Sequence, residues 1–144
     1  MREIWNGIQV TVSALGGVFA WFLGGLDGLV YALIAFVVAD YISGFLLAVT
    51  ERKLSSKIGA EGIAKKVALF LLVGVAHLAD VHLLGGGGAL RSAVICFYIT
   101  NEGVSLLENT TRLGLPVPEK LKSVLAGLHG KSDEDGKDEN NDHY

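Results

Sequence analysis

Cysteine, proline and charge are scarce in this sequence. A single cysteine among 144 residues excludes a disulfide within the chain, and its neighbours Ile95 and Phe97 predict that Cys96 is a small, buried apolar residue. Both prolines follow Gly114, at positions 116 and 118, where we expect helical structure to end. Only 19% of the residues are charged, against 51% hydrophobic and a mean hydropathy of +0.46. This composition indicates a protein that resides in a membrane.

Signatures of catalysis and of nucleic-acid binding are also missing. The sequence has no nucleophile elbow, no phosphate loop and no metalloprotease helix, so we expect no enzyme and no cofactor. No basic surface is rich enough in arginine and aromatics to predict a nucleic-acid partner. His77 and Asp80 share a helix face, but His82 points elsewhere, and no second group of ligands accompanies them. We therefore expect no metal site.

Four apolar segments remain, and they predict an all-α membrane protein with three to four transmembrane helices. About 20 helical residues cross a hydrocarbon core of about 30 Å. The segments place helices at about 5–25, 29–50, 64–84 and 90–109, within a membrane domain of residues 1–128. Residues 129–144 are expected to form a disordered acidic tail. A signal peptide is the competing interpretation of the first segment, but no clear cleavage site follows it.

Basic residues in the connections predict the orientation. The stretch from Glu51 to Lys66 is interpreted as a polar loop, and its five lysines and arginines place it in the cytoplasm. Four spans then put both chain ends in the cytoplasm. The fourth segment has a short uncharged stretch, Ser92 to Asn101, so three spans with an external C-terminus is the alternative.

Small residues recur at helical spacing, as in helices that pack closely in lipid. Gly16, Ala20, Gly24 and Gly28 form a predicted ridge along the first span and its exit, and Gly44 lies on a similar strip of the second. The sequence does not separate packing within one bundle from packing between subunits.

Asp40 and Asp80 stand out because a charged carboxylate at the bilayer centre costs about 2.5–3.5 kcal/mol even on the lenient insertion scale. Neither side chain should face lipid. They have several alternative partners: each other, His77, His82, Arg91, or water in an oligomer. A polar clamp within one bundle and the lining of an aqueous lesion both remain open.

The order of several short motifs resembles the toxin secretion and phage lysis holins of Gram-positive phages and prophages, from about Asp27 to Leu125. The motifs are Asp40-x-x-x-Gly44; Leu54-Ser55-Ser56 with Gly59, Gly62 and Lys66; Asp80; Phe97-Tyr98-Ile99-x-Asn101-Glu102; Ser105 and Glu108-Asn109; and Gly114-x-Pro116-x-Pro118. The acidity of the tail departs from the many holins that end in basic residues.

The resemblance implies a homo-oligomer in the bacterial cytoplasmic membrane, surrounded by lipid, that opens abruptly and releases an endolysin or a toxin, with host cell lysis as the result. It also allows regulation by an antiholin. On this reading Asp40, Gly44, Asp80, Asn101, Glu102, Gly16, Ala20 and Gly24 are candidates for oligomerisation or for the pore. A small proton- or cation-coupled transporter, with Asp40, Asp80 and Glu102 as a relay, is the main alternative, and a non-lytic scaffold subunit is the third.

Overall fold

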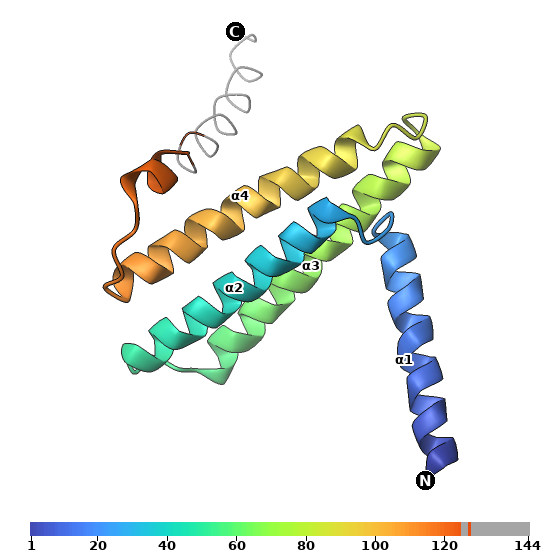
Figure 1. Cartoon of the computed structure of the whole chain (residues 1–144), viewed down its shortest axis with the longest axis horizontal. Coiled ribbons are helices and arrows are strands. Elements are labelled where there is room, and N and C mark those ends of the chain that lie inside the picture. Colours follow the sequence, from blue (N-terminus) through green and yellow to red (C-terminus); the bar gives the residue numbers. More distant parts are fainter. Residues whose placement is uncertain (125–126, 128–144) are drawn as a thin grey trace, which may run out of the picture.

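The computed structural model describes residues 1–124 and 127, which form four long α-helices without any strand in that part of the chain (Figure 1). They are α1 (Arg2–Phe22), α2 (Gly28–Thr50), α3 (Ser56–His82) and α4 (Ala89–Arg112). The all-α prediction is confirmed. The expected tail at 129–144 lies outside the described residues.

α2, α3 and α4 form a three-helix bundle in which α3 runs antiparallel to the other two (Figure 1). α4 packs along both α2 and α3, whereas α1 leaves the bundle at one end and contacts it only there (Figure 1). In α2 and α3 the buried side chains are mostly three or four residues apart, the spacing of a helix face turned toward its neighbours. The fully buried members of the bundle core include Leu33, Val73 and Ile95.

α1 ends at Phe22, just before two glycines that adopt a left-handed backbone conformation. Gly24 and Gly25 have positive φ angles of 81° and 99°, and the Gly25 N–H donates to the Ala20 carbonyl in a Schellman-type cap. Gly24 and Gly28 therefore do not continue a ridge on α1, and that part of the sequence prediction is wrong. Asp27 is the N-cap of α2, because its Oδ1 accepts the Val30 N–H at 3.0 Å.

α3 begins at Ser56, eight residues earlier than predicted. The polar connection is therefore only Glu51 to Ser55, and the interpretation of Glu51 to Lys66 as a loop is wrong. Gly59 and Gly62 lie inside the helix, where each costs about 1 kcal/mol relative to alanine, and packing of the rest of α3 outweighs this cost. Lys66 therefore lies within α3, inside the bundle and not in a loop.

Two helices, α2 and α3, are long and apolar enough by themselves to cross a membrane. α4 carries Arg91 and Glu102, but the bundle buries both, leaving them 7% and 8% exposed. The apolar side chains lie mostly on the outside: Val38, Ile42 and Leu72 are each about half exposed. A bundle that buries charge and exposes hydrocarbon matches lipid as its solvent.

Candidate functional site: a polar centre in the helix bundle

Charged side chains from three helices meet near the middle of the bundle. Asp40 extends from α2, Lys66 from α3 and Glu102 from α4. The Lys66 ammonium donates to Asp40 Oδ2 at 2.6 Å, and it also forms an ion pair with Glu102. One ammonium thus neutralises one of two carboxylates, so the three groups carry a formal charge of −1 when all are ionised.

An amide and a hydroxyl complete this arrangement, which we call the polar centre (Asp40, Ser43, Lys66, Glu102 and Asn109). Asn109 Nδ2 donates to Asp40 Oδ1 at 3.2 Å and to Ser43 Oγ at 3.0 Å. The Ser43 hydroxyl in turn donates to the Asp40 backbone carbonyl at 2.9 Å. Both Asp40 carboxylate oxygens therefore have a donor, as burial of an ionised group requires.

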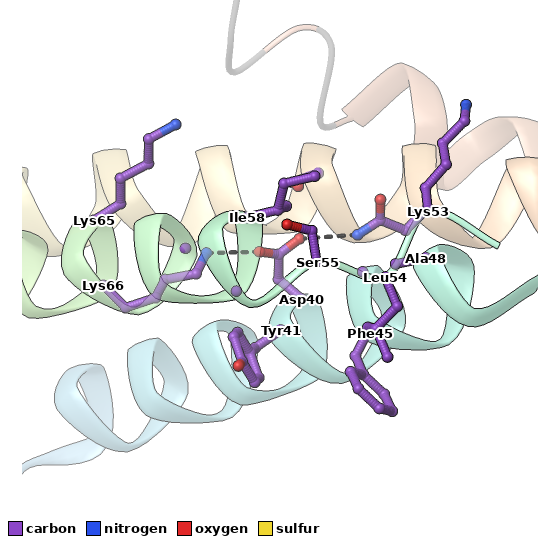
Figure 2. Close-up of a pocket in the computed structure, with 15 residues that line it drawn as sticks. Asp40, Tyr41, Phe45, Ala48, Lys53, Leu54, Ser55, Ile58, Lys65 and Lys66 are labelled. Atoms are coloured by element: carbon purple, nitrogen blue, oxygen red, sulfur yellow. Dashed lines mark hydrogen bonds and ion pairs between the residues drawn. The ribbon is translucent and has the colours of Figure 1, made fainter. Parts of the chain in front are cut away.

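A cavity of about 370 Å³ adjoins the polar centre. It is lined by residues of α2, the short loop, the start of α3 and α4, and the lining includes glycines at 44, 59 and 62. Its volume is far above the 10–15 Å³, roughly, that one water molecule needs. Figure 2 shows Lys66 pointing toward Asp40, whereas Lys53 and Lys65 point away from it. The polar centre can therefore be hydrated from one side.

A second polar cluster joins the far end of the bundle to the α1 exit, and we call it the joint (Leu23, Gly25, Asp27, Asp80 and Arg91). Asp80, 1% exposed, accepts the backbone N–H groups of Leu90 at 3.1 Å and Arg91 at 2.6 Å, and so it caps α4. The Arg91 guanidinium donates to the carbonyls of Leu23 and Gly25 and to Asp27 Oδ2 at 2.7 Å.

The charge pairing at the joint has an electrostatic consequence. The hydrogen bond from Arg91 holds the pKa of Asp27 below its usual value, and the Val30 N–H acts in the same direction. At the opposite end of the bundle, hydrogen bonds from Lys53 and then Arg112 lower the pKa of Glu51. Charge pairs therefore occur at both ends of the bundle.

Asp40 and Asp80, the two carboxylates that the sequence analysis emphasised, lie in different clusters. Asp40 belongs to the polar centre, and its partners Lys66 and Asn109 were not among those expected. Asp80 does meet Arg91, one of its expected partners, but through the Arg91 backbone N–H. A sequence signal for Lys66 existed: it stands three residues before Leu69 in the series 66, 69, 73, 76, 80, whose later members are all buried.

The other candidates are dispersed. Gly44 lines the cavity, and a Cβ there would lie 3.5 Å from Asn109 Nδ2. Asn101 precedes Glu102 on α4, and its buried Oδ1 has no hydrogen-bond partner among the described residues. Gly16 is exposed on α1 and Ala20 is half-buried. Gly24 lies beside the joint, between Leu23 and Gly25, and a Cβ there would lie 2.8 Å from Arg91 Nε.

Cys96 is exposed on α4, so the prediction that it is buried is wrong. Its neighbour Ile95 faces the core instead, because adjacent helical residues point about 100° apart. No group of three metal-ligating side chains occurs within residues 1–124 and 127.

Comparison with known proteins places this bundle in a family. The model of the bacteriophage holin family matches residues 17–130, which include the joint and the polar centre. The chain belongs to the bacteriophage holin family. No solved structure matches it.

Relatives of this chain occur in bacteria and in a phage. It is 44% identical over 128 residues to an uncharacterized protein of Listeria monocytogenes, covering 89% of this chain and 91% of that one. It is 38% identical over 131 residues to an uncharacterized 14.9 kDa protein of Clostridium perfringens, covering 91% and 99%. A protein of Bacillus phage phi105 named as a probable holin is 33% identical over 105 residues, covering 73% and 76%.

Proposed function

We propose that this holin accumulates in the cytoplasmic membrane, self-assembles and opens lesions that let an endolysin reach the cell wall, so that the host cell lyses. The observation that carries the proposal is the family match across residues 17–130, supported by the relative named as a probable holin. The bundle itself adds a physical argument, because its apolar outside and charged inside suit a protein stored in lipid.

The polar centre supplies the means of opening. While Asp40, Lys66 and Glu102 pair with one another, the bundle presents hydrocarbon to the lipid. Rearrangement of several copies around water would expose these groups as a polar lining, and the cavity beside Asp40 gives water a place to begin. When a lesion forms, contacts with water replace the ion pairs of these groups within one chain.

The same rearrangement would respond to the membrane potential. A net charge within the membrane field contributes about 2.3 kcal/mol per 100 mV when it moves across the whole field. With a formal charge of −1 at the polar centre, loss of the potential changes the balance between closed and open arrangements by a fraction of that energy.

We place the end of the bundle that carries the α2–α3 connection in the cytoplasm. The described residues near this end include Arg52, Lys53, Lys57, Arg112, Lys120 and Lys122. At the opposite end Arg91 is buried against Asp27. The excess of lysine and arginine near one end is typical of the cytoplasmic side.

The proposal is tested by inducing the holin in a bacterial host with and without an endolysin. We expect growth to stop abruptly in both cultures and lysis only where the endolysin is present. Addition of an energy poison before the programmed time should bring lysis forward at once, because the potential collapses. Growth that continues after induction, or lysis that does not depend on the endolysin, would contradict the proposal.

The charge imbalance at the polar centre also favours a second candidate, a small proton- or cation-coupled transporter that uses Asp40 and Glu102. This function predicts gradual flux through intact cells and no lethality. A pH-sensitive dye inside sealed vesicles separates the two. A transporter gives slow, saturable acidification, whereas a holin releases trapped protein-sized markers once it opens.

A further inference from the structure

The cavity beside the polar centre has room for more than water. Its volume of about 370 Å³ lies in the range of ligand pockets, roughly 300–1,000 Å³. Most of its lining comes from α2 and α3, which make few direct contacts with each other, whereas α4 packs along both. Small residues line both sides, with Gly44 and Ala48 on α2 and Gly59 and Gly62 on α3. The bundle therefore has a space between two of its helices that their own side chains leave unfilled.

The charges that line this cavity are mostly positive. Lys53, Lys65 and Lys66 contribute three ammonium groups, against one carboxylate from Asp40. That carboxylate already has its partners, because Lys66 and Asn109 each donate to one of its oxygens. The cations left to meet a ligand are thus Lys53 and Lys65.

The charges of these two lysines are not balanced within the described residues. Lys65 is exposed and forms no ion pair in that part of the chain. Lys53 pairs with Glu51 at 3.1 Å, but the same carboxylate also pairs with Arg112. One negative charge therefore serves two positive ones, and the cavity attracts an anion.

The rest of the lining is apolar and open to the surroundings of the bundle. Its large side chains are between 40% and 60% exposed: Tyr41, Phe45, Leu54 and Ile58. In Figure 2, Lys53 and Lys65 extend to one side of the cavity, and Tyr41 and Phe45 extend to the other. A ligand that matches both sides has an anionic group joined to an apolar body.

We propose that this cavity binds one anionic phospholipid of the inner leaflet, with its headgroup facing Lys53 and Lys65 and an acyl chain along Phe45 and Ile58. Basic pockets between membrane helices on the cytoplasmic side are typical sites for acidic headgroups. The cavity lies at the end of the bundle that we place in the cytoplasm. The choice of leaflet rests on the proposed function, whereas the binding itself does not.

Such a lipid would control the access of water to the polar centre. An acyl chain in the cavity excludes water from the side of Asp40 that is otherwise open to it. A ligand that binds only the folded bundle stabilises it by mass action. The bound lipid therefore favours the closed bundle, and its departure admits water beside the buried charges.

Binding is tested with the purified full-length chain in detergent micelles. Phosphatidylglycerol is added, and native mass spectrometry counts the lipids that stay on each chain. We expect one phosphatidylglycerol per chain, retained several-fold better than phosphatidylcholine with the same acyl chains. Inorganic phosphate should displace it poorly, because inorganic phosphate has no apolar part. Equal retention of the two lipids, or ready displacement by inorganic phosphate, would overturn the inference.

A charge variant tests whether the two lysines hold the headgroup. Lys53→Gln with Lys65→Gln should lower the retention of phosphatidylglycerol several-fold and bring it close to that of phosphatidylcholine. Lys57→Gln with Lys120→Gln is the matched control, because it removes the same charge from exposed lysines that do not line the cavity. Equal losses in the two double variants would mean that overall charge attracts the lipid, and the inference would fail.

A filling variant tests the cavity itself. A Cβ at Gly59 meets nothing within 4 Å, so Gly59→Leu adds a side chain to the lining without a clash at its first carbon. It should lower phosphatidylglycerol retention several-fold and abolish the rise in thermal unfolding temperature that this lipid gives the parent. Ala60→Leu, at an exposed position outside the lining, should leave both unchanged.

Two results separate the remaining alternatives. Unchanged lipid retention in Gly59→Leu, together with a loss of dimers, would assign the cavity to a second copy of the chain and overturn the inference. Because binding is measured on purified protein, a chain that binds the lipid but never causes lysis would contradict only the proposed function.

Discussion

Lys66 joins carboxylates from two other helices, so its charge influences the packing of all three. Its side chain is 20% exposed and its two partners about half of that. Removing one member of a buried ion cluster leaves an uncompensated charge, which costs about 3–5 kcal/mol, whereas replacing the whole cluster with neutral groups of similar size is often nearly neutral. The polar centre therefore affects stability mainly through the balance between its positive and negative charges.

Lys66→Met should destabilise the bundle by about 3 kcal/mol or more, because Asp40 and Glu102 then face each other without a cation. Adding Asp40→Asn and Glu102→Gln to Lys66→Met should recover most of the loss. Thermal unfolding in detergent, followed by circular dichroism, measures both changes. Lys65→Met is the control, since the adjacent lysine is exposed and should alter stability by less than about 0.5 kcal/mol. A Lys66→Met protein as stable as the parent would show that the cluster does not hold the bundle.

Asp27 offers a pH dependence with a definite sign. Its pKa in the folded protein is lowered, chiefly by the Arg91 hydrogen bond, so the pairing stabilises above the unfolded pKa of about 3.9 and is lost as pH falls through the lower folded value. Between about pH 5 and about pH 3, the parent should lose more thermal stability than Asp27→Asn, which keeps a capping oxygen but no charge. Identical losses in the two proteins would exclude the ion pair as the cause.

The sequence predicts α2 far better than α3, and the reason is physical. α2 is apolar throughout apart from Asp40, and its observed bounds, Gly28–Thr50, differ from the predicted 29–50 by one residue. The first turns of α3 contain two glycines, which disfavour a helix when considered locally, and several charged residues, which disfavour a membrane span. These turns are mostly exposed, and the helix continues into them from Lys66, whose partners Asp40 and Glu102 lie in distant parts of the chain. Lys66 was missed for the same reason.

The attachment of α1 to α3 depends on the absence of a side chain at Gly74. A Cβ there would collide with the Phe22 ring, so Gly74→Ala should force the ring away. Overpacking costs about 1–3 kcal/mol, which exceeds the gain of about 0.5–1 kcal/mol from replacing a helical glycine with alanine. We expect net destabilisation, measured by thermal unfolding, and a lower fluorescence anisotropy of Trp21. In Gly7→Ala a Cβ meets nothing within 4 Å, so we expect only the stabilisation that comes from replacing a helical glycine with alanine. Equal effects in the two variants would contradict this account.

Within the helix bundle, Asp40, Asp80, Arg91 and Glu102 are buried, whereas many large apolar side chains are exposed. The sequence alone indicated this from its apolar segments, and the prediction that the chain is an all-helical membrane protein rested on it. The segments did not reveal which polar residues meet, since Asp40 and Asn109 are 69 positions apart and no local pattern connects them. They also did not show that α1 stands apart, because its composition resembles that of a bundle helix.

The placement of the two ends of the bundle gives a last prediction. The ion pair between Arg112 and Glu51, at 2.5 Å, shows that the ends of α4 and α2 lie side by side, while the glycine run at 85–88 lies at the opposite end with the joint. If the basic end faces the cytoplasm, then a thiol in the glycine run faces outward and one at the start of α3 faces inward. In a Cys96→Ala background, Gly86→Cys should react with a membrane-impermeant maleimide added to intact spheroplasts before triggering. Ser56→Cys should react only after the membrane is permeabilised. The reverse pattern would invert the orientation, and labelling of both from outside would mean that α3 does not cross the membrane.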